Sequence, residues 1–309
     1  MAVLFRSTPA ATERWRPLLA ALLPEHEIRY WPDIGDKAAI DYALVWQPEP
    51  GLLASLPNLK LIFGLGAGVD HLLGDPALPK DVPIVRLVDP YMTDAMSEYV
   101  TLSVLRLHRQ DLDYLAQQRE AVWLERDQKN AAERPVGILG FGALGQNAAK
   151  KLRALGFPVS GWSRGPRDVA GFATYAGPAG LAALLAASEI LVCLLPLTAD
   201  TAGILNAGLF ARLPRGAGLV NAGRGGHLVE ADLIPALDSG QLSGAVLDVA
   251  RTEPLPAAHP FWRHKRIILT PHIAAETHPP TAAPIIREAI GRFEAGLPVA
   301  NLVDRARGY

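Results

Sequence analysis

Three side chains suited to catalysis follow three different apolar runs of this 309-residue chain. Arg224 stands in NAGRGG, Glu253 in DVARTEPLP and His272 in LTPHIAAETHP. Histidine can transfer a proton near neutral pH, and arginine can pair with a carboxylate or a phosphate. Each residue alone has an ordinary explanation: a solvated loop residue, a surface acid, or a packed ring. Together, at consecutive strand ends of a parallel sheet, they form a candidate catalytic set.

A glycine pattern upstream could hold phosphate groups. In PVGILGFGALGQNAAKKL, residues 135–152, Gly140, Gly142 and Gly145 follow an expected strand and open an expected helix. Gly140 would allow a tight turn, Gly142 the close approach of a pyrophosphate, and Gly145 close packing of the helix on the strand. The alternative is a glycine-rich bend that matches by chance. The context favours the phosphate turn, with N–H groups at the helix start holding the anion.

The end of the next strand bears on the choice of dinucleotide. Sheets that bind NAD usually carry Asp or Glu there, about 20 residues after the glycines, to hold the ribose 2′-hydroxyl. Here VSGW runs into Ser163, Arg164 and Arg167, and no carboxylate occurs before Asp168. Serine and arginine suit a 2′-phosphate, which guanidinium binds with paired hydrogen bonds. We therefore expect NADP(H) to be preferred, with NAD(H) possible; the alternative is that these arginines form a solvated loop.

The elements around these residues predict an α/β fold. Strands are expected at AVLF, EIRYW, YALVW, LKLIFGLG and VPIVRL, and a helix at TERWRPLLAALLP. This alternation implies a mostly parallel sheet with helices on both faces. Residues 97–123 contain no Pro or Gly and predict one long helix that connects two domains. After Pro135 the alternation restarts and predicts a second doubly wound sheet.

We therefore expect two doubly wound parallel-sheet (Rossmann-like) domains. Residues 99–275 would form the dinucleotide-binding domain, and residues 1–98 with 276–309 the substrate-binding domain. The substrate domain would be discontinuous, because the last helical stretch, PIIREAIGRFEAG, is expected to pack back on it.

Composition argues against several other classes of protein. The formal net charge is −1, so there is no basic surface for nucleic acid or anionic membranes. Apolar runs such as ILVCLLPL are too short to span a bilayer, and Arg6 and Glu13 interrupt any signal-peptide core. Cys193 is the single cysteine, so no internal disulfide can form, and the histidines show no metal-ligand spacing. We expect a cytoplasmic protein without nucleic acid, membrane or metal partners.

The combination of motifs resembles the D-isomer-specific 2-hydroxyacid dehydrogenase family, and in particular its glyoxylate/hydroxypyruvate reductase A branch. The resemblance covers essentially the whole chain. It implies NADPH-dependent reduction of small 2-ketoacids, glyoxylate to glycolate and hydroxypyruvate to D-glycerate, by a homodimer. The segments that carry it are DYALVWQPEPGLLASLPNLKLIFGLGAGVDHLL, GILGFGALG, GWSR, NAGRGGHLVEADLIPALDSGQLSGAVLDV, EPLP, TPHIAA and the terminal VDRARGY.

The resemblance assigns roles to the candidate catalytic set. His272 would protonate the keto oxygen, and Glu253 would fix the tautomer of its ring. Arg224 would bind the substrate carboxylate and polarise the carbonyl. One departure lies beside it, because Gly223 replaces the alanine of the common N-x-A-R-G pattern. That glycine could loosen the backbone around Arg224.

The resemblance also implies substrate and cofactor contacts elsewhere. The N–H groups of Ala67 and Gly68 in GLGAGVD would hold the substrate carboxylate. Trp46 would limit the pocket to small substrates, with a core tryptophan as the rival interpretation. Further cofactor contacts are expected at Ala143, Leu144, Pro196, Thr201, Ala222, Gly223, Asp248, which would face the nicotinamide amide, and Ala274.

Two kinds of alternative remain open at this point. One is another member of the same family, such as a formate, phosphite or phosphoglycerate dehydrogenase. The other is a non-catalytic dinucleotide-sensing protein, like the transcriptional corepressors that share the fold, since fold alone does not fix function.

Overall fold

The computed structural model describes residues 1–308. Its Cα positions divide into two compact units. The terminal unit joins Met1–Met92 to the chain from Glu276 onward, and the central unit is Thr93–Ala275. That these units are the substrate-binding and dinucleotide-binding domains stays a prediction. Within residues 1–308 no helix is long and apolar enough to cross a membrane, and no cluster of three or more His, Cys, Asp or Glu could hold a metal ion.

The terminal unit contains a five-stranded parallel sheet in the order β2-β1-β3-β4-β5. Helix α1 (Pro9–Leu22) begins after Thr8, whose hydroxyl accepts the N–H of Ala11 at 3.3 Å. It packs against α9 (Pro279–Glu294), so both ends of the chain contribute to this unit. The other elements are β1 (Ala2–Arg6), β2 (Glu27–Tyr30), β3 (Ile40–Val45), β4 (Leu61–Gly64), α2 (Asp70–Leu73) and β5 (Ile84–Arg86).

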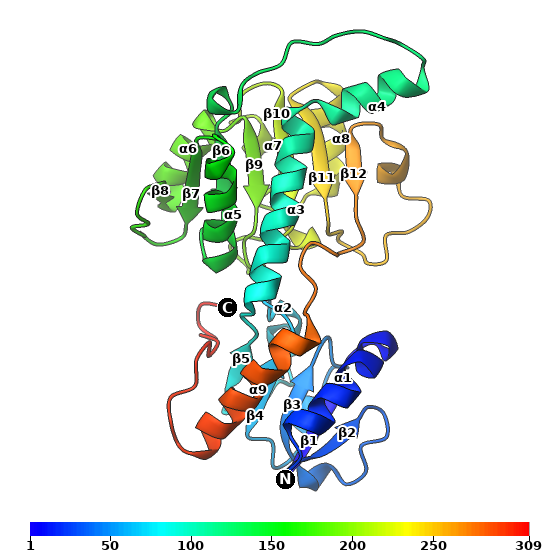
Figure 1. Ribbon diagram of the computed structural model, residues 1–309, viewed down its shortest axis with the longest axis vertical. Helices are drawn as coiled ribbons and strands as arrows, with labels where there is room; N and C mark the ends of the chain where they lie inside the picture. Colours follow the sequence, from blue (N-terminus) through cyan, green and yellow to red (C-terminus); the bar gives the residue numbers. More distant parts are fainter. Residues whose placement is uncertain (309) are drawn as a thin grey trace. The chain divides into compact units, whose positions relative to one another are not determined.

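The central unit contains a seven-stranded parallel sheet in the order β12-β11-β10-β9-β6-β7-β8 (Figure 1). The strand order reverses at β6, and such sheets bind ligands outside the strands' carboxyl ends at this switch point. The strands are β6 (Val136–Leu139), β7 (Val159–Ser163), β8 (Ala173–Ala176), β9 (Ile190–Cys193), β10 (Ala217–Asn221), β11 (Leu242–Leu247) and β12 (Ile267–Leu269). The helices are α3 (Pro90–His108) from Thr93 onward, α4 (Asp111–Arg119), α5 (Ala143–Ala154), α6 (Gly177–Ala187), α7 (Ala207–Phe210) and α8 (Glu230–Asp238).

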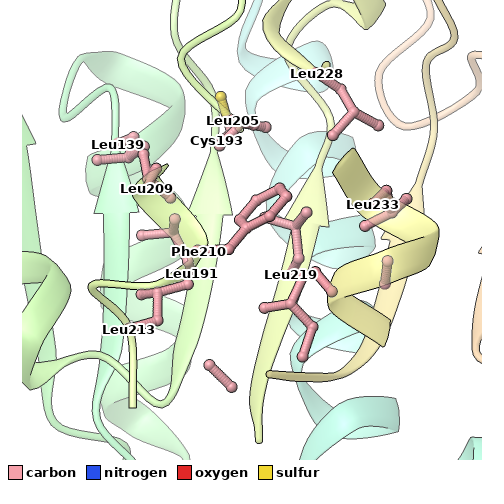
Figure 2. Close-up of a cluster of buried hydrophobic side chains, with 14 of the residues drawn as sticks. Leu139, Leu191, Cys193, Leu205, Leu209, Phe210, Leu213, Leu219, Leu228 and Leu233 are labelled. Atoms are coloured by element: carbon pink, nitrogen blue, oxygen red, sulfur yellow. The ribbon is translucent and has the colours of Figure 1, made fainter. Parts of the chain in front are cut away.

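The inner strands of the central unit are buried on both faces and alternate between two cores. In β9, Leu191 and Cys193 belong to the core closed by α6, α7 and α8. Ile190 and Val192 belong to the core closed by α3 and α5. Figure 2 draws the first core, with Cys193 among leucines and Phe210. Burial raises the pKa of the Cys193 thiol to about 12, so the group stays a protonated thiol at neutral pH.

The predicted fold class is confirmed, but the prediction of one helix over residues 97–123 is wrong. Helix α3 ends at His108, and α4 begins at Asp111. Gln110 between them has a φ of +59°, in the left-handed region that cannot continue a helix. Its side-chain amide donates to the Asp127 carbonyl at 2.6 Å, so the chain beyond α4 folds back on the break. Trp123 therefore lies outside any helix, with 98% of its surface exposed.

Candidate functional site

The three glycines of the turn after β6 differ in what a Cβ atom at each position would contact. Gly140 has a φ of +96°, and a Cβ there would lie 2.6 Å from the Leu194 carbonyl oxygen. A Cβ on Gly145 would overlap the Gly140 carbonyl oxygen, so α5 packs directly on the turn. Gly142 precedes α5, makes no side-chain cap, and has open space within 4 Å of the Cβ position. That N–H groups at the start of α5 hold a pyrophosphate stays a prediction.

The chain after β7 carries the expected arginines on the surface. Ser163 ends the strand, and Arg164 follows it with Nη1 3.7 Å from Asp200 Oδ2. An exposed ion pair of this length contributes little and would not prevent a phosphate from binding the guanidinium. The Arg167 carbonyl accepts the Thr174 hydroxyl at 2.6 Å, which ties this loop to β8. The loop thus offers positive charge at the strand end, as the sequence predicts.

His272 and Glu253 form a direct pair. The Nδ1 atom of His272 lies 2.8 Å from Oε2 of Glu253. Because a carboxylate only accepts hydrogen bonds, Nδ1 carries the proton and Nε2 is the nitrogen that can exchange one. The other carboxylate oxygen accepts the N–H of Ala250 at 3.0 Å. About a third of each side chain in the pair is exposed, so a small ligand can reach it.

The environment keeps Glu253 charged. Partial burial acts to raise the pKa of its carboxyl group. The hydrogen bonds from His272 and the Ala250 N–H, with the positive charges of His272 and Arg224, outweigh burial and hold the pKa of Glu253 below its ordinary value. At neutral pH the carboxylate therefore accepts from the ring rather than competing with it for a proton.

A buried carboxylate holds the turn that presents His272. Asp248 is only 2% exposed. Its Oδ1 atom accepts from the Thr270 hydroxyl at 2.7 Å and from the Ile273 N–H at 2.9 Å. Its Oδ2 atom accepts from the Ala274 N–H at 2.8 Å. Within this turn His272 has a φ of +57°, which is uncommon for a residue with a Cβ. That Asp248 also faces a nicotinamide amide stays a prediction.

Sequence reasoning missed the outer part of this network. Tyr99 on α3 lies with its hydroxyl 2.7 Å from the Thr270 hydroxyl, so a chain of hydrogen bonds runs from α3 to Asp248. Burial raises the pKa of Tyr99 to about 12, so its hydroxyl keeps the proton that it donates. Nothing in the sequence indicated that residues 99 and 270 would meet.

Arg224 stands on a loop that Asn221 stabilises. The Asn221 side chain accepts the Gly223 N–H at 3.2 Å and donates to the Arg224 carbonyl at 3.1 Å. The guanidinium of Arg224 donates through Nη1 to the Gly223 carbonyl at 2.8 Å. Asn221 was not among the expected site residues, although asparagine at a strand end commonly bonds to the backbone just beyond it.

The other expected cofactor contacts lie beyond neighbouring strands of the same sheet. Thr201 donates its hydroxyl to the Pro196 carbonyl at 2.7 Å and closes the loop after β9. The N–H of Ala222 reaches the Cys193 carbonyl at 3.2 Å, which holds the end of β10 beside β9. Within the central unit, the candidate cofactor residues thus follow β6, β7, β9, β10, β11 and β12 at their carboxyl ends, and Ala143 and Leu144 open α5.

The substrate residues expected in the terminal unit lie together after β3 and β4. Trp46 follows β3, and a Cβ on Gly66 would lie 2.7 Å from its ring. The ring of His71 also packs against the indole, with ring centroids 4.7 Å apart. Ala67 and Gly68 follow directly, so the indole supports the loop that carries them. Trp46 is half-buried, which is compatible with both a pocket wall and a packed core residue.

Comparisons with known proteins give matches to both the sequence and the structure of this chain. The family model for the NAD binding domain of D-isomer specific 2-hydroxyacid dehydrogenases matches residues 101–274. The chain is 46% identical over 302 residues to a glyoxylate/hydroxypyruvate reductase A of Serratia proteamaculans, covering 96% of each protein.

Two solved structures are also similar over the whole chain. A D-isomer specific 2-hydroxyacid dehydrogenase from Xanthobacter autotrophicus Py2, in complex with NADPH and MES, superposes with a TM-score of 0.94 at 45% identity, covering 100% of this chain and 99% of that one. An NADPH-dependent glyoxylate/hydroxypyruvate reductase from Sinorhizobium meliloti, in complex with NADP and sulfate, gives 0.93 at 43% identity with the same coverage.

Proposed function

The chain belongs to the D-isomer specific 2-hydroxyacid dehydrogenase family, and within it we propose that the protein is an NADPH-dependent reductase of small 2-ketoacids. Its reactions are the reduction of glyoxylate to glycolate and of hydroxypyruvate to D-glycerate. The observation that carries the proposal is the contact of 2.8 Å between His272 and Glu253. This pair and the glycine turn after β6 follow strands of the same sheet. The names of similar proteins supply the substrate class.

Each member of the candidate catalytic set has a chemical task in this proposal. NADPH, when bound, supplies the hydride. His272 delivers a proton from Nε2 to the keto oxygen, while Glu253 holds the protonated Nδ1. Arg224 pairs with the substrate carboxylate and stabilises the negative charge that develops on the carbonyl oxygen. In the terminal unit, the N–H groups of Ala67 and Gly68 are assigned to the carboxylate and Trp46 to size selection.

The preference for NADPH follows from the loop after β7. Ser163, Arg164 and Arg167 provide a hydroxyl and two guanidinium groups where NAD-binding sheets usually carry a carboxylate. Two similar proteins were crystallised with NADPH or NADP, which supports the same choice. A higher kcat/KM with NADH than with NADPH would contradict it.

The decisive experiment follows absorbance of the reduced cofactor with NADPH or NADH and with glyoxylate, hydroxypyruvate or pyruvate. We expect rapid oxidation of NADPH with the first two ketoacids. His272→Ala should lower kcat by about 100-fold to 10,000-fold, the usual contribution of a general acid, while NADPH still binds. Turnover only with another acid would indicate a different member of the family. NADPH binding without any turnover would indicate a dinucleotide-sensing protein.

We propose in addition that the protein is a cytoplasmic homodimer. Val122, Trp123 and Leu124 are consecutive and are 45%, 98% and 61% exposed. Exposed aromatic and apolar side chains grouped in this way are typical of interfaces. Light scattering should give twice the chain mass of 33.1 kDa, and a monomer mass at micromolar concentration would refute the dimer.

A further inference from the structure

A second histidine of the central unit lies between two of the loops just described. His227 follows Arg224 by three residues, and none of its surface is exposed. Its Nδ1 atom accepts the N–H of Arg224 at 3.1 Å. Its Nε2 atom lies 3.3 Å from the carbonyl oxygen of Pro196. The ring therefore joins the loop after β10 to the loop after β9.

We infer that His227 is a positioning residue that fixes the Arg224 loop against the Pro196 loop. The inference rests on the proposed function, because it is that function which assigns substrate binding to Arg224 and cofactor contact to Pro196. The sequence alone assigned no role to this histidine. Its place in the fold gives it a role through two neighbouring groups instead.

The two contacts define one protonation state of the ring. Nδ1 receives an N–H donor, so it carries no proton. Nε2 faces a carbonyl oxygen, which only accepts, so it carries the proton. A neutral imidazole thus uses both nitrogens, one as acceptor and one as donor. Leucine, of similar bulk, would leave the Arg224 N–H without this acceptor and the Pro196 carbonyl without this donor.

The backbone around His227 prevents the ring from moving away. The His227 carbonyl accepts the N–H of Leu205 at 2.9 Å, and the Leu205 carbonyl accepts the N–H of Val229 at 2.9 Å. The side chains of Leu205 and Leu228 both lie in the core drawn in Figure 2. Thr201 donates to the same Pro196 carbonyl that His227 reaches, at 2.7 Å. The ring is therefore held by a paired segment on one side and a closed loop on the other.

The same ring accounts for Gly223, the departure from the family pattern. A Cβ at this position would lie 3.0 Å from Nδ1 and 3.1 Å from Cε1 of His227. It would also lie 3.1 Å from the Leu195 carbonyl oxygen. With an alanine here, the imidazole or the Leu195 carbonyl would have to shift by a few tenths of an ångström. Glycine at 223 thus leaves room for the ring of His227 in its bond to Arg224.

The test compares His227→Leu and His227→Gln with a control, His108→Leu. His108 is also a buried histidine of the central unit, but it packs on Phe157 from α3, and its Nδ1 has no hydrogen-bond partner in residues 1–308. For each variant we would measure the thermal midpoint, the NADPH Kd by fluorescence, and kcat and KM with glyoxylate.

His227→Leu should lower kcat/KM for glyoxylate by about tenfold or more and raise the NADPH Kd several-fold, because two buried polar groups lose their partner. His227→Gln, which keeps one acceptor and one donor, should recover part of both losses. His108→Leu should lower the thermal midpoint without changing either constant. Equal kinetic effects of His227→Leu and His108→Leu, or an unchanged NADPH Kd in His227→Leu, would overturn the inference.

A double-mutant cycle tests the pairing with Gly223. Gly223→Ala should reduce NADPH affinity in the wild-type background and have a smaller further effect in His227→Ala, which removes the ring that the new methyl group meets but keeps its contact with the Leu195 carbonyl oxygen. Additive effects would overturn the pairing. Absence of turnover in the wild type would refute the proposed function, whereas the NADPH Kd of each variant would still decide the role of His227.

Discussion

Several turns of the central unit contain a residue in the left-handed region. The turns after β6 and after β12 reach this conformation in opposite ways. After β6, Gly140 has a φ of +96°, and the turn forms because its glycines have no Cβ atom to clash with nearby backbone. After β12, His272 has a φ of +57°, and the carboxylate of Asp248 holds this turn by accepting backbone hydrogen bonds from it. The first turn offers backbone N–H groups, and the second offers an imidazole.

The two turns differ in the free-energy cost of the left-handed conformation and in the interactions that offset this cost. Glycine adopts positive φ without steric penalty, whereas a residue with a Cβ costs roughly 1–3 kcal/mol there. Asp248 accepts three hydrogen bonds around the second turn, and bonds to a charged group contribute about 1.5–3 kcal/mol each. The network is therefore large enough to hold His272 in a conformation that its own backbone disfavours. Five substitutions test this difference.

The largest effect is expected from Asp248→Asn. The amide keeps one oxygen and turns an NH2 group toward a backbone N–H or a hydroxyl that needs an acceptor. The His272 turn should relax, and kcat should fall by about 100-fold, equivalent to about 2.7 kcal/mol or the loss of one such bond. Steady-state kinetics and the thermal midpoint would measure this. A variant with wild-type kcat would show that the second turn does not depend on the carboxylate.

A smaller loss, about tenfold in kcat, is expected from Glu253→Gln, because the neutral amide stabilises a protonated ring less well. The low pKa of Glu253 also fixes a pH dependence. Its contribution to stability is fully present above the ordinary glutamate range and disappears as the pH falls through the lowered value. The difference in thermal midpoint between wild type and variant should therefore shrink as the pH falls below about 4. A difference that keeps growing below about pH 4 would contradict this sign.

The first turn is tested by a matched pair, Gly142→Ala and Gly145→Ala. A Cβ at 142 meets open space, so the thermal midpoint should stay unchanged while NADPH binds about tenfold more weakly, because the methyl occupies room assigned to the phosphates. A Cβ at 145 meets the Gly140 carbonyl, so the fold itself should lose about 1–3 kcal/mol. Calorimetry and fluorescence titration separate the two. Equal destabilisation by both would remove the distinction between binding and packing glycines.

The smallest effect is expected from Tyr99→Phe, which removes the outermost hydrogen bond of the Asp248 network. One hydrogen bond between neutral groups contributes about 0.5–1.5 kcal/mol. We expect a small drop in the thermal midpoint and at most about a threefold change in kcat. A loss of kcat as large as that in Asp248→Asn would show that the second turn is stabilised mainly by the hydrogen bond from Tyr99 on α3, not by the carboxylate.

The same contrast explains how much the sequence could predict. The glycine turn and most strands follow from local patterns, because the residues of each are close in the chain. The two parallel sheets follow from the alternation of strands with helices. The pairing of His272 with Glu253 came from the family resemblance. Asp248, Thr270 and Tyr99 meet across up to 171 positions, and no local pattern indicates such a contact.

The break at Gln110 illustrates the same limit. A run without Pro or Gly favours one helix, but the left-handed residue and its bond to Asp127 depend on how the following loop returns. His227 is intermediate, since its position three residues after Arg224 was visible and its ring contacts were not.

The single thiol, Cys193, can report how often the central sheet opens locally. Cys193 lies in β9, between β6 and β10, and none of its surface is exposed. Thiol reagents attack the thiolate, which is both inaccessible and scarce while the strand stays in place. The rate of labelling therefore measures how often the centre of this sheet separates, without any introduced probe. A dinucleotide that binds the adjoining turn would slow that labelling in proportion to its occupancy.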